Sequence, residues 1–299
     1  MAEKKAKEKG KLRRRIKRRK TENDVPYVGD CSDENEEQLR EGPRRGFYLI
    51  PNLLTSSSLM LGFYSLSLSF GAFINPRAEV DYFFRAAWAL FAAMIFDGLD
   101  GRVARLTRTT SSFGLHFDSL ADLVSFGIAP AALIYNFALR WGTRPGLGWA
   151  VAFLFIICGA MRLARFNITT ESLPKDVFQG LAIPAAASVP VFSVLLFLDM
   201  EWVTEQGTAP VFWPFVVLMV ALALLMVSTF KYPNFKSVNI HKRRPFGTFL
   251  FVVVLLIIVF EEPAKTLFLA AVIYALSAPV KWCFTRWRTP ATPLDAQAN

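Results

Sequence analysis

The sequence predicts an all-α, polytopic membrane protein built as a bundle of helices. Of its 299 residues, 53% are hydrophobic and 28 are Phe, whereas soluble proteins are usually about 45 to 50% apolar. The apolar residues gather in runs, and most runs approach the roughly 20 residues that a helix needs to cross a bilayer. We expect eight transmembrane helices in total, of which six form the core of the fold.

The expected spans share a high apolar content with few charged residues. They cover residues 50–73, 82–103, 118–138, 148–166, 183–199, 211–229, 246–260 and 266–281. The seventh span is short, and its boundary with the eighth is soft. The chain accordingly divides into a polar tail over residues 1–46, a transmembrane domain over residues 47–285 and a short C-terminal tail over residues 286–299.

The net charge of +10 belongs to the N-terminal tail. The first 20 residues hold 12 of the 34 basic residues and two of the 24 acidic ones, which leaves 22 of each in the rest of the chain. Residues 21–42 are polar and acidic and have the composition of a linker. A basic tail beside a membrane domain indicates a solvated segment near anionic lipid headgroups, with RNA binding as the alternative. The balanced remainder gives no reason to expect nucleic acid as a partner.

The placement of Lys and Arg sets the expected orientation in the membrane. With the first tail in the cytoplasm and eight crossings, 14 Lys and Arg outside the tail fall on the cytoplasmic side and five on the other. Because positive residues favour the cytoplasmic side, both termini are predicted to be cytoplasmic in a multi-pass protein of the inner membrane. The stretch from Asp97 to Asp122 then lies at the cytoplasmic surface, within reach of a water-soluble ligand.

Four carboxylates interrupt the apolar background. Asp97 and Asp100 are three residues apart and share one face of a helix, while Asp118 and Asp122, four apart, share a face of the next helix. A carboxylate at membrane depth costs about 2.5 to 3.5 kcal/mol, and four together also repel one another. A pair of divalent cations between the helices would offset both terms. Oxygen ligands without clustered His or Cys favour Mg²⁺ or Mn²⁺ over zinc.

Two other interpretations of these Asp residues are open. One is a structural ion-pair network with Arg102, Arg105 and Arg108. The other is the ion pathway of a divalent-cation transporter, because carboxylates inside a membrane also mark such pathways. A transporter site would lie near the middle of the bilayer, often at broken helices, whereas this cluster is expected at a cytoplasmic end. Ion pairing alone would not require Gly101 and Gly114.

Small and basic residues around the carboxylates suit a phosphate ligand. Gly101 and Ala104 lie one turn apart and allow a ligand or a helix to approach the backbone closely. Arg105 can hold a phosphate with its planar fork of donors, or act only as a positive-inside residue. Asn52 follows a proline at the start of the first span, where it either caps the helix or faces the ligand. We expect these residues and Gly114 to line a site for a phosphate ligand.

Two arginines close the fourth span. Arg162 and Arg165 are three residues apart and share a helical face. They either anchor the helix at the cytoplasmic surface or recognise an anion, such as a lipid phosphate or a substrate carboxylate. The two histidines, His116 and His241, do not begin an H-x-K-x4-D motif, in which the histidine acts as a covalent nucleophile. A covalent intermediate of that kind is therefore excluded.

The spacing around the carboxylates forms a signature. The pattern D-x2-D-G-x2-A-R-x8-G-x3-D-x3-D is matched at every fixed position by Asp97, Asp100, Gly101, Ala104, Arg105, Gly114, Asp118 and Asp122. The chain thereby resembles the CDP-alcohol phosphotransferases, integral membrane enzymes of phospholipid synthesis. The resemblance implies a CDP-linked lipid donor, release of CMP, direct transfer to an alcohol and a homodimer with a site in each protomer. It also implies that Asp97, Asp100 and Asp118 are metal ligands, and that Asp122 is the general base and can contact metal too. The residues that it implies for the nucleotide and diphosphate are Asn52, Gly101, Ala104, Arg105 and Gly114.

Three further segments, HFDSLADLVSFGIAPA, GAMRLARFN and GLAIPAAA, are similar to one branch of that family, the membrane-embedded phosphatidylserine synthases. The likeness extends over about residues 46–285. This branch implies CDP-diacylglycerol as the donor and L-serine as the acceptor, with Arg162 or Arg165 available for the serine carboxylate. Glycerol 3-phosphate or an inositol compound is the alternative acceptor.

Overall fold

The computed structural model describes residues 49–75, 78–107, 111–142, 144–169, 178–200, 211–232, 253–254 and 257–288. Within these ranges the chain is a bundle of helices with a single pair of two-residue strands, so the predicted all-α fold is confirmed. The tail of residues 1–46 lies outside the described residues. So does most of the expected seventh span and most of the C-terminal tail.

Helices over the described residues match the expected spans in order. They are α3 (Leu49–Ile74), α4 (Glu79–Thr107), α5 (Ser112–Asp122), η3 (Leu123–Ile128), α6 (Ala129–Phe137), η4 (Leu139–Trp141), α7 (Pro145–Thr169), α8 (Ile183–Asp199), α9 (Phe212–Val227) and α11 (Pro263–Arg288). Five continuous stretches are long and apolar enough to cross a membrane, and α8 and α9 are shorter apolar helices. The protein is therefore a multi-pass membrane protein, and the described residues account for seven of the eight expected spans.

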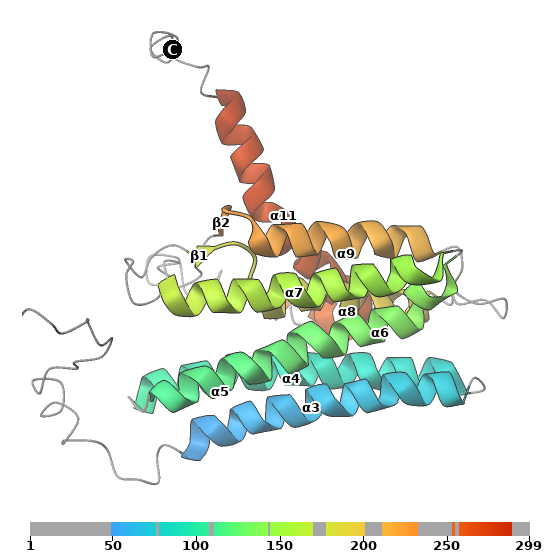
Figure 1. Cartoon of the computed structure of the whole chain (residues 1–299), viewed down its shortest axis with the longest axis horizontal. Coiled ribbons are helices and arrows are strands. Elements are labelled where there is room, and N and C mark those ends of the chain that lie inside the picture. The colour runs from blue at the N-terminus through green and yellow to red at the C-terminus, as the bar shows by residue number, and fades with distance from the viewer. Residues whose placement is uncertain are drawn as a thin grey trace, which may run out of the picture. The chain divides into compact units, whose positions relative to one another are not determined.

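The helices form layers around a central rod. Figure 1 shows α3 and α4 side by side along one edge of the bundle and α7 and α9 along the opposite edge. The continuous rod α5–η3–α6 lies between these pairs, and α8 packs against α4, α6 and α11. Because α3 and α4 are antiparallel neighbours, the beginning of α3 lies beside the end of α4. The rod also begins at this end, where α5 contacts α3.

A stripe of small residues allows α3 and α4 to pack closely. The buried positions of this stripe recur every three or four residues and are Thr55, Ser58, Gly62, Ser65, Ser69 and Ala72. Small side chains let two helix backbones approach each other in a membrane. Most hydroxyl groups in the stripe donate to backbone carbonyls, as Ser69 does to Ser65 at 2.9 Å, which satisfies them in the apolar interior. The buried hydroxyl of Ser65 has no hydrogen-bond partner.

The central rod is interrupted by a π-helical turn. Over η3 the backbone bonds run to the fifth residue back, and the N–H of Ala129 donates to the carbonyl of Val124. Pro130 follows at the start of α6, where its missing N–H is tolerated. Turns of this kind are rare in proteins, and those that occur are often found at functional sites. This one begins directly after Asp122, the last of the four carboxylates.

A short strand pair joins the segment before α8 to the segment after α9. The strands β1 (Phe178–Gln179) and β2 (Lys231–Tyr232) are antiparallel. Gly180 follows β1 with a φ of 81°, a left-handed conformation that favours glycine. Its N–H donates to the carbonyl of Phe230 at 2.9 Å, and an added Cβ would lie 2.5 Å from the carbonyl oxygen of Met226. Glycine is therefore required at the entry to α8.

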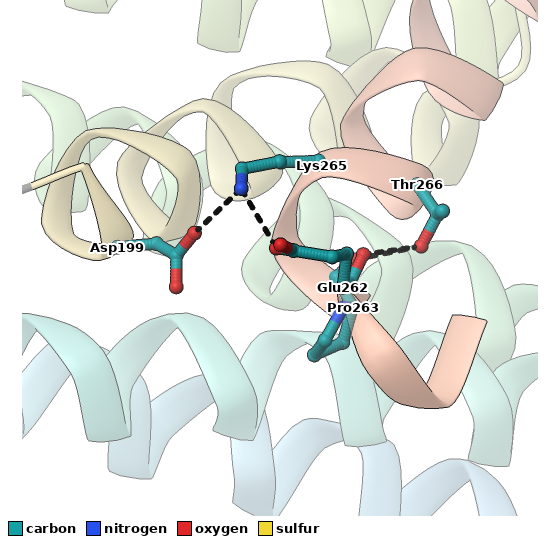
Figure 2. A network of polar contacts seen from close by, with 5 residues as sticks. All are labelled: Asp199, Glu262, Pro263, Lys265 and Thr266. Carbon is teal, nitrogen blue, oxygen red and sulfur yellow. Dashed lines mark hydrogen bonds and ion pairs between the residues drawn. The ribbon is translucent and has the colours of Figure 1, made fainter. Parts of the chain in front are cut away.

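The far end of the bundle is joined by exposed ion pairs. The ammonium group of Lys265 lies 2.8 Å from a Glu262 oxygen and 4.0 Å from an oxygen of Asp199, which ends α8 (Figure 2). Thr266 donates to the backbone carbonyl of Glu262 at 2.7 Å. Since these charged side chains are about half exposed, solvent screens the attraction. The pairs orient α11 against α8 rather than stabilise the bundle strongly.

Candidate active site

Two helices bring the predicted carboxylates together at one end of the bundle. Asp97 and Asp100 lie on α4, and Asp118 and Asp122 lie on α5. One carboxylate oxygen from each of Asp97, Asp100 and Asp118 lies within 4.8 Å of the other two. The carboxyl group of Asp122 lies beside that of Asp97, and the two interact. The structure thus gathers all four residues into one cluster.

The chemistry of the cluster fits a divalent cation. Asp118 Oδ1 is buried and has no hydrogen-bond partner. Asp100 is only 5% exposed and accepts a hydrogen bond from the Thr55 hydroxyl at 2.8 Å. Closely grouped carboxylates repel one another unless a positive charge lies among them, and hard cations such as Mg²⁺ take carboxylate oxygens as ligands. The Asp group can therefore hold a metal ion.

A structural ion-pair network does not explain the cluster. Over the described ranges, no Lys or Arg nitrogen lies within 4.0 Å of an oxygen of the four Asp residues. Arg102 and Arg105 are both exposed on the outer part of α4. Arg108, the third arginine of that interpretation, lies outside the described residues. Because the described residues form no direct ion pair with the cluster, an ion-pair network does not balance its negative charge.

A cavity of about 470 Å³ opens beside the carboxylates. It lies among the start of α3, the end of α4 and the start of α5, and Asp100 and Asp118 line it. The five residues predicted to face the nucleotide and its diphosphate all line the same cavity: Asn52, Gly101, Ala104, Arg105 and Gly114. An added Cβ on Gly101 would meet no atom closer than 3.9 Å, so this glycine leaves open space that a ligand can use.

The carboxylates form two layers along the helix axes. Asp100 and Asp118 line the cavity, whereas Asp97 and Asp122 are not among its lining residues. Asp97 precedes Asp100 on α4 and Asp122 follows Asp118 on α5, so both lie about one turn, or roughly 5 Å, deeper in the bundle. The contact between Asp97 and Asp122 belongs to this deeper layer. A ligand in the cavity meets Asp100 and Asp118 first.

Local structure explains why glycine stands at position 114. Ser111 caps α5, and its hydroxyl accepts a hydrogen bond from the N–H of Gly114 at 3.0 Å. An added Cβ on Gly114 would lie 3.1 Å from Ser111 Oγ and 3.5 Å from Asn52 Oδ1. Glycine therefore lets the first turn of α5 approach the first turn of α3. Gly114 shapes the wall of the cavity rather than supplying a polar ligand group.

The two arginines of α7 have different environments. The guanidinium of Arg162 is directed inward, where its Nε is buried without a hydrogen-bond partner, and it interacts electrostatically with Asp122 and Tyr274. Arg165 is exposed. Neither lines the cavity beside α3. Arg162 is thus the arginine placed next to the deeper layer of carboxylates, on the side away from the predicted nucleotide residues.

Other side chains complete the surroundings of the site. The spacing of Asn52 and Thr55, three residues apart, predicts that both share an inward face, and Thr55 donates a hydrogen bond to Asp100 at 2.8 Å. On α5, Ser119 accepts a hydrogen bond from the Asn167 side-chain amide of α7 at 3.1 Å, a contact between distant segments that no spacing predicts. Tyr274 comes from α11, more than 100 residues beyond Arg162. No local pattern could connect those two positions.

A larger cavity of about 600 Å³ lies elsewhere in the bundle, among the start of α4, the end of α8 and the start of α11. Its two acidic lining residues, Asp81 and Asp199, are each in or near an ion pair. Asp81 and Asp100 are separated by 19 residues of α4, or roughly 28 Å of helix. The carboxylate cluster and its cavity therefore lie at the opposite end, which is not the midplane position expected of a transporter site.

Comparisons with known proteins agree with this site. Residues 48–206 match the CDP-alcohol phosphatidyltransferase family, a range that contains all four Asp residues. The chain is 42% identical over 243 residues to a CDP-diacylglycerol–serine O-phosphatidyltransferase of Helicobacter pylori, covering 81% of this chain and 94% of the relative. An archaetidylserine synthase of Methanothermobacter thermautotrophicus is 33% identical over 190 residues, covering 63% of this chain and 71% of the relative.

A relative from yeast shares the central part of the chain. The CDP-diacylglycerol–serine O-phosphatidyltransferase of Saccharomyces cerevisiae is 42% identical over 153 residues, which is 49% of this chain and 51% of the relative. The family match covers more than half of the chain, and the Helicobacter relative is matched over nearly its full length. The protein belongs to the CDP-alcohol phosphatidyltransferase family, and the resemblance predicted from the Asp signature is confirmed.

Proposed function

We propose that the protein transfers a phosphatidyl group from CDP-diacylglycerol to the hydroxyl of L-serine, forming phosphatidylserine and releasing CMP. The strongest support is the 42% identity to the CDP-diacylglycerol–serine O-phosphatidyltransferase of Helicobacter pylori, over 94% of that relative's length. The cluster of four carboxylates beside a cavity supplies the matching chemistry. The acceptor hydroxyl attacks the phosphorus of the phosphatidyl group, the bond from that phosphorus to the oxygen of CMP breaks, and CMP leaves.

In this proposal the cavity beside α3 takes the nucleotide end of the donor. Arg105 binds a phosphate oxygen with its guanidinium, and Gly101 allows the diphosphate to approach the backbone of α4. Asn52 contributes a side-chain amide from the first turn of α3. The two acyl chains extend into the surrounding lipid, because the cavity lies at the end of membrane-spanning helices.

The proposed metal ligands are Asp97, Asp100, Asp118 and Asp122. Mg²⁺ or Mn²⁺, two ions in our proposal, would supply neutralisation of the charge on the diphosphate and on the leaving phosphate. Thr55 orients Asp100 by donating to one of its oxygens, which leaves the second oxygen for a cation. Such partners of ligating carboxylates fix their orientation.

Asp122 is the proposed general base. It takes the proton from the acceptor hydroxyl as the new bond to phosphorus forms. Asp122 lies in the deeper layer of carboxylates and does not line the cavity proposed for the nucleotide. Arg162 interacts with Asp122 and has a buried Nε with no partner, so it can bind an acceptor carboxylate next to the base. Arg165 is exposed and is the weaker candidate.

The remaining parts of the proposal concern the assembly in the membrane. We place the carboxylate end of the bundle and both termini on the cytoplasmic side of the inner membrane, since Lys and Arg favour that side. The catalytic domain covers residues 47–285, with a polar tail over residues 1–46 and a short tail over residues 286–299. We also propose a homodimer in which each protomer carries its own site.

An acceptor panel tests the proposed reaction. Purified protein in detergent with Mn²⁺ and radiolabelled CDP-diacylglycerol should release CMP when L-serine is added. Glycerol 3-phosphate and inositol should support release at least about 100-fold more slowly, because a site built to hydrogen-bond the serine carboxylate loses those bonds with an acceptor that lacks this group. Efficient use of either alcohol without serine turnover would refute serine as the acceptor. Uptake of Mn²⁺ into sealed vesicles without CMP release would instead indicate a transporter.

A further inference from the structure

A chain of buried hydroxyl groups links three helices one turn below the carboxylates. Ser125 of η3 donates through Oγ to the carbonyl of Ser58 on α3 at 3.2 Å. Ser58 in turn donates through its own Oγ to the carbonyl of Ala93 on α4 at 3.1 Å. Ser125 and Ala93 are fully buried, and Ser58 is 3% exposed. Water does not reach these hydrogen bonds, so each one constrains the helices that it joins.

The ends of this chain lie directly beneath the two Asp pairs. Ala93 precedes Asp97 by four residues, which is about one turn of α4. Ser125 follows Asp122 by three residues at the start of the π turn. Asp97 and Asp122 are the two carboxylates in contact with each other. The hydroxyl chain therefore fixes α4 and η3 to the same segment of α3 immediately below that contact.

Close packing of Gly62 fixes the same junction sterically. An added Cβ at this position would lie 2.6 Å from Ser125 Oγ, 2.7 Å from Ser125 Cα and 2.9 Å from Ser125 Cβ. Two of these atoms belong to the side chain, but Cα belongs to the backbone and cannot rotate away. Any side chain at position 62 would push η3 away from α3. Such a shift would reach Asp122 through the rigid helix.

The π turn determines which way the Asp pair of α5 faces. The hydrogen bond from the Ala129 N–H to the Val124 carbonyl spans five residues instead of four. The turn therefore holds one residue more than a regular α-helical turn. In an α-helix one residue corresponds to a rotation of about 100°. Residues before the turn are thereby rotated relative to the buried face of α6. If the turn became α-helical, Asp118 and Asp122 would turn away from Asp97 and Asp100.

We propose that Ser58, Gly62 and Ser125 are positioning residues that hold the π turn against α3 and so set the distance between the two Asp pairs. None of the three lines the cavity beside α3 or belongs to the carboxylate cluster. The proposal rests on the proposed function only in assigning a cation to the carboxylates. It predicts that disturbing this junction weakens cation binding as well as turnover, whereas a purely structural role would alter thermal stability alone.

The test compares matched serine variants of the purified full-length protein. Ser125→Ala removes the first hydrogen bond without adding volume. Its control is Ser69→Ala, because Ser69 is also fully buried but donates within its own helix. Mn²⁺ binding is followed by the EPR signal of the free ion, and kcat by CMP release at saturating Mn²⁺. Ser125→Ala should raise the Mn²⁺ dissociation constant about 10-fold, with no change for Ser69→Ala.

A glycine pair tests the steric part. Gly62→Ala should raise the Mn²⁺ dissociation constant further and lower kcat about 100-fold, the size expected of a shift near 1 Å. Its control is Gly146→Ala, where an added Cβ meets no atom within 4 Å. Thermal unfolding of the metal-free proteins shows whether each variant is folded. If Gly62→Ala does not fold, Ser125→Ala decides alone.

The binding readout needs no acceptor, so it separates this inference from the identity of the substrate. Wild-type Mn²⁺ affinity and wild-type kcat in Ser125→Ala would overturn the positioning role, even if that variant unfolded at a lower temperature. The proposed function would stand in that case. Conversely, failure of serine as an acceptor would leave a 10-fold weaker Mn²⁺ affinity in Ser125→Ala as support for the positioning role.

Discussion

Asp122→Asn is expected to lower kcat by about 1,000-fold or more while the protein stays folded. The substitution keeps the size and shape of the side chain but leaves an amide that cannot accept the proton of the acceptor hydroxyl. General bases contribute about 100- to 10,000-fold to rate, and Asp122 is also a proposed metal ligand. The measurement is serine-dependent CMP release at saturating Mn²⁺, with thermal unfolding as the check on folding.

The matched control is Asp81→Asn. Asp81 is another carboxylate of a membrane helix, but it lies at the far end of α4 and pairs with Arg85 at 2.8 Å. We expect it to keep activity within about twofold of the wild type, because exposed surface pairs contribute little. If Asp122→Asn retained a tenth of the wild-type rate, Asp122 could not be the base, and the proton would have to leave through another group.

Asp118→Asn is expected to weaken metal binding while the metal-free protein stays folded. Asp118 Oδ1 is buried without a partner, and the side chain stands beside Asp97 and Asp100. Without metal, the variant should unfold at a higher temperature than the wild type, since one of several mutually repelling buried charges is removed. With Mn²⁺ the order should reverse. A ligand at 100 times its dissociation constant stabilises the wild type by about 2.7 kcal/mol, whereas the variant binds it weakly.

Activity of the same variant should follow the metal. At an Mn²⁺ concentration that saturates the wild type, CMP release should fall below about 1% of the wild-type rate, and higher Mn²⁺ should restore part of it. A variant that lost activity but gained as much thermal stability from Mn²⁺ as the wild type would show that Asp118 is not a ligand. Equal unfolding temperatures of the metal-free proteins would show that repulsion among the clustered carboxylates does not destabilise the wild type.

Most of the site could be predicted because helix periodicity and the cost of carboxylates in an apolar helix indicate the same cluster. Residues three or four apart share a helical face, so the spacing of Asp97 with Asp100 and of Asp118 with Asp122 already placed each pair. The cost of carboxylates in an apolar helix then required a counter-charge. The five residues expected around the nucleotide all line one cavity beside the cluster, although their contact with a nucleotide stays a prediction.

The unpredicted parts depend on contacts between distant segments. Periodicity placed Arg162 and Arg165 on one face, yet Arg162 interacts with Asp122 and has a buried Nε, whereas Arg165 is exposed. The helical pattern of residues 118–138 gave no sign of the π turn, because an extra residue in one turn changes the register without changing the composition. Tyr274 and Ser125 reach the site only through the packing of α11 and α3. Single-sequence patterns do not encode such packing.

The most direct measurement is anomalous diffraction at the manganese edge from crystals grown with Mn²⁺ and a CDP-linked lipid. We expect one or two manganese peaks between α4 and α5, within about 2.0 to 2.3 Å of carboxylate oxygens of Asp97, Asp100, Asp118 or Asp122, with the diphosphate next to Arg105. Manganese bound elsewhere in an active protein, with these carboxylates turned away from the diphosphate, would contradict a metal-assisted transfer at this site.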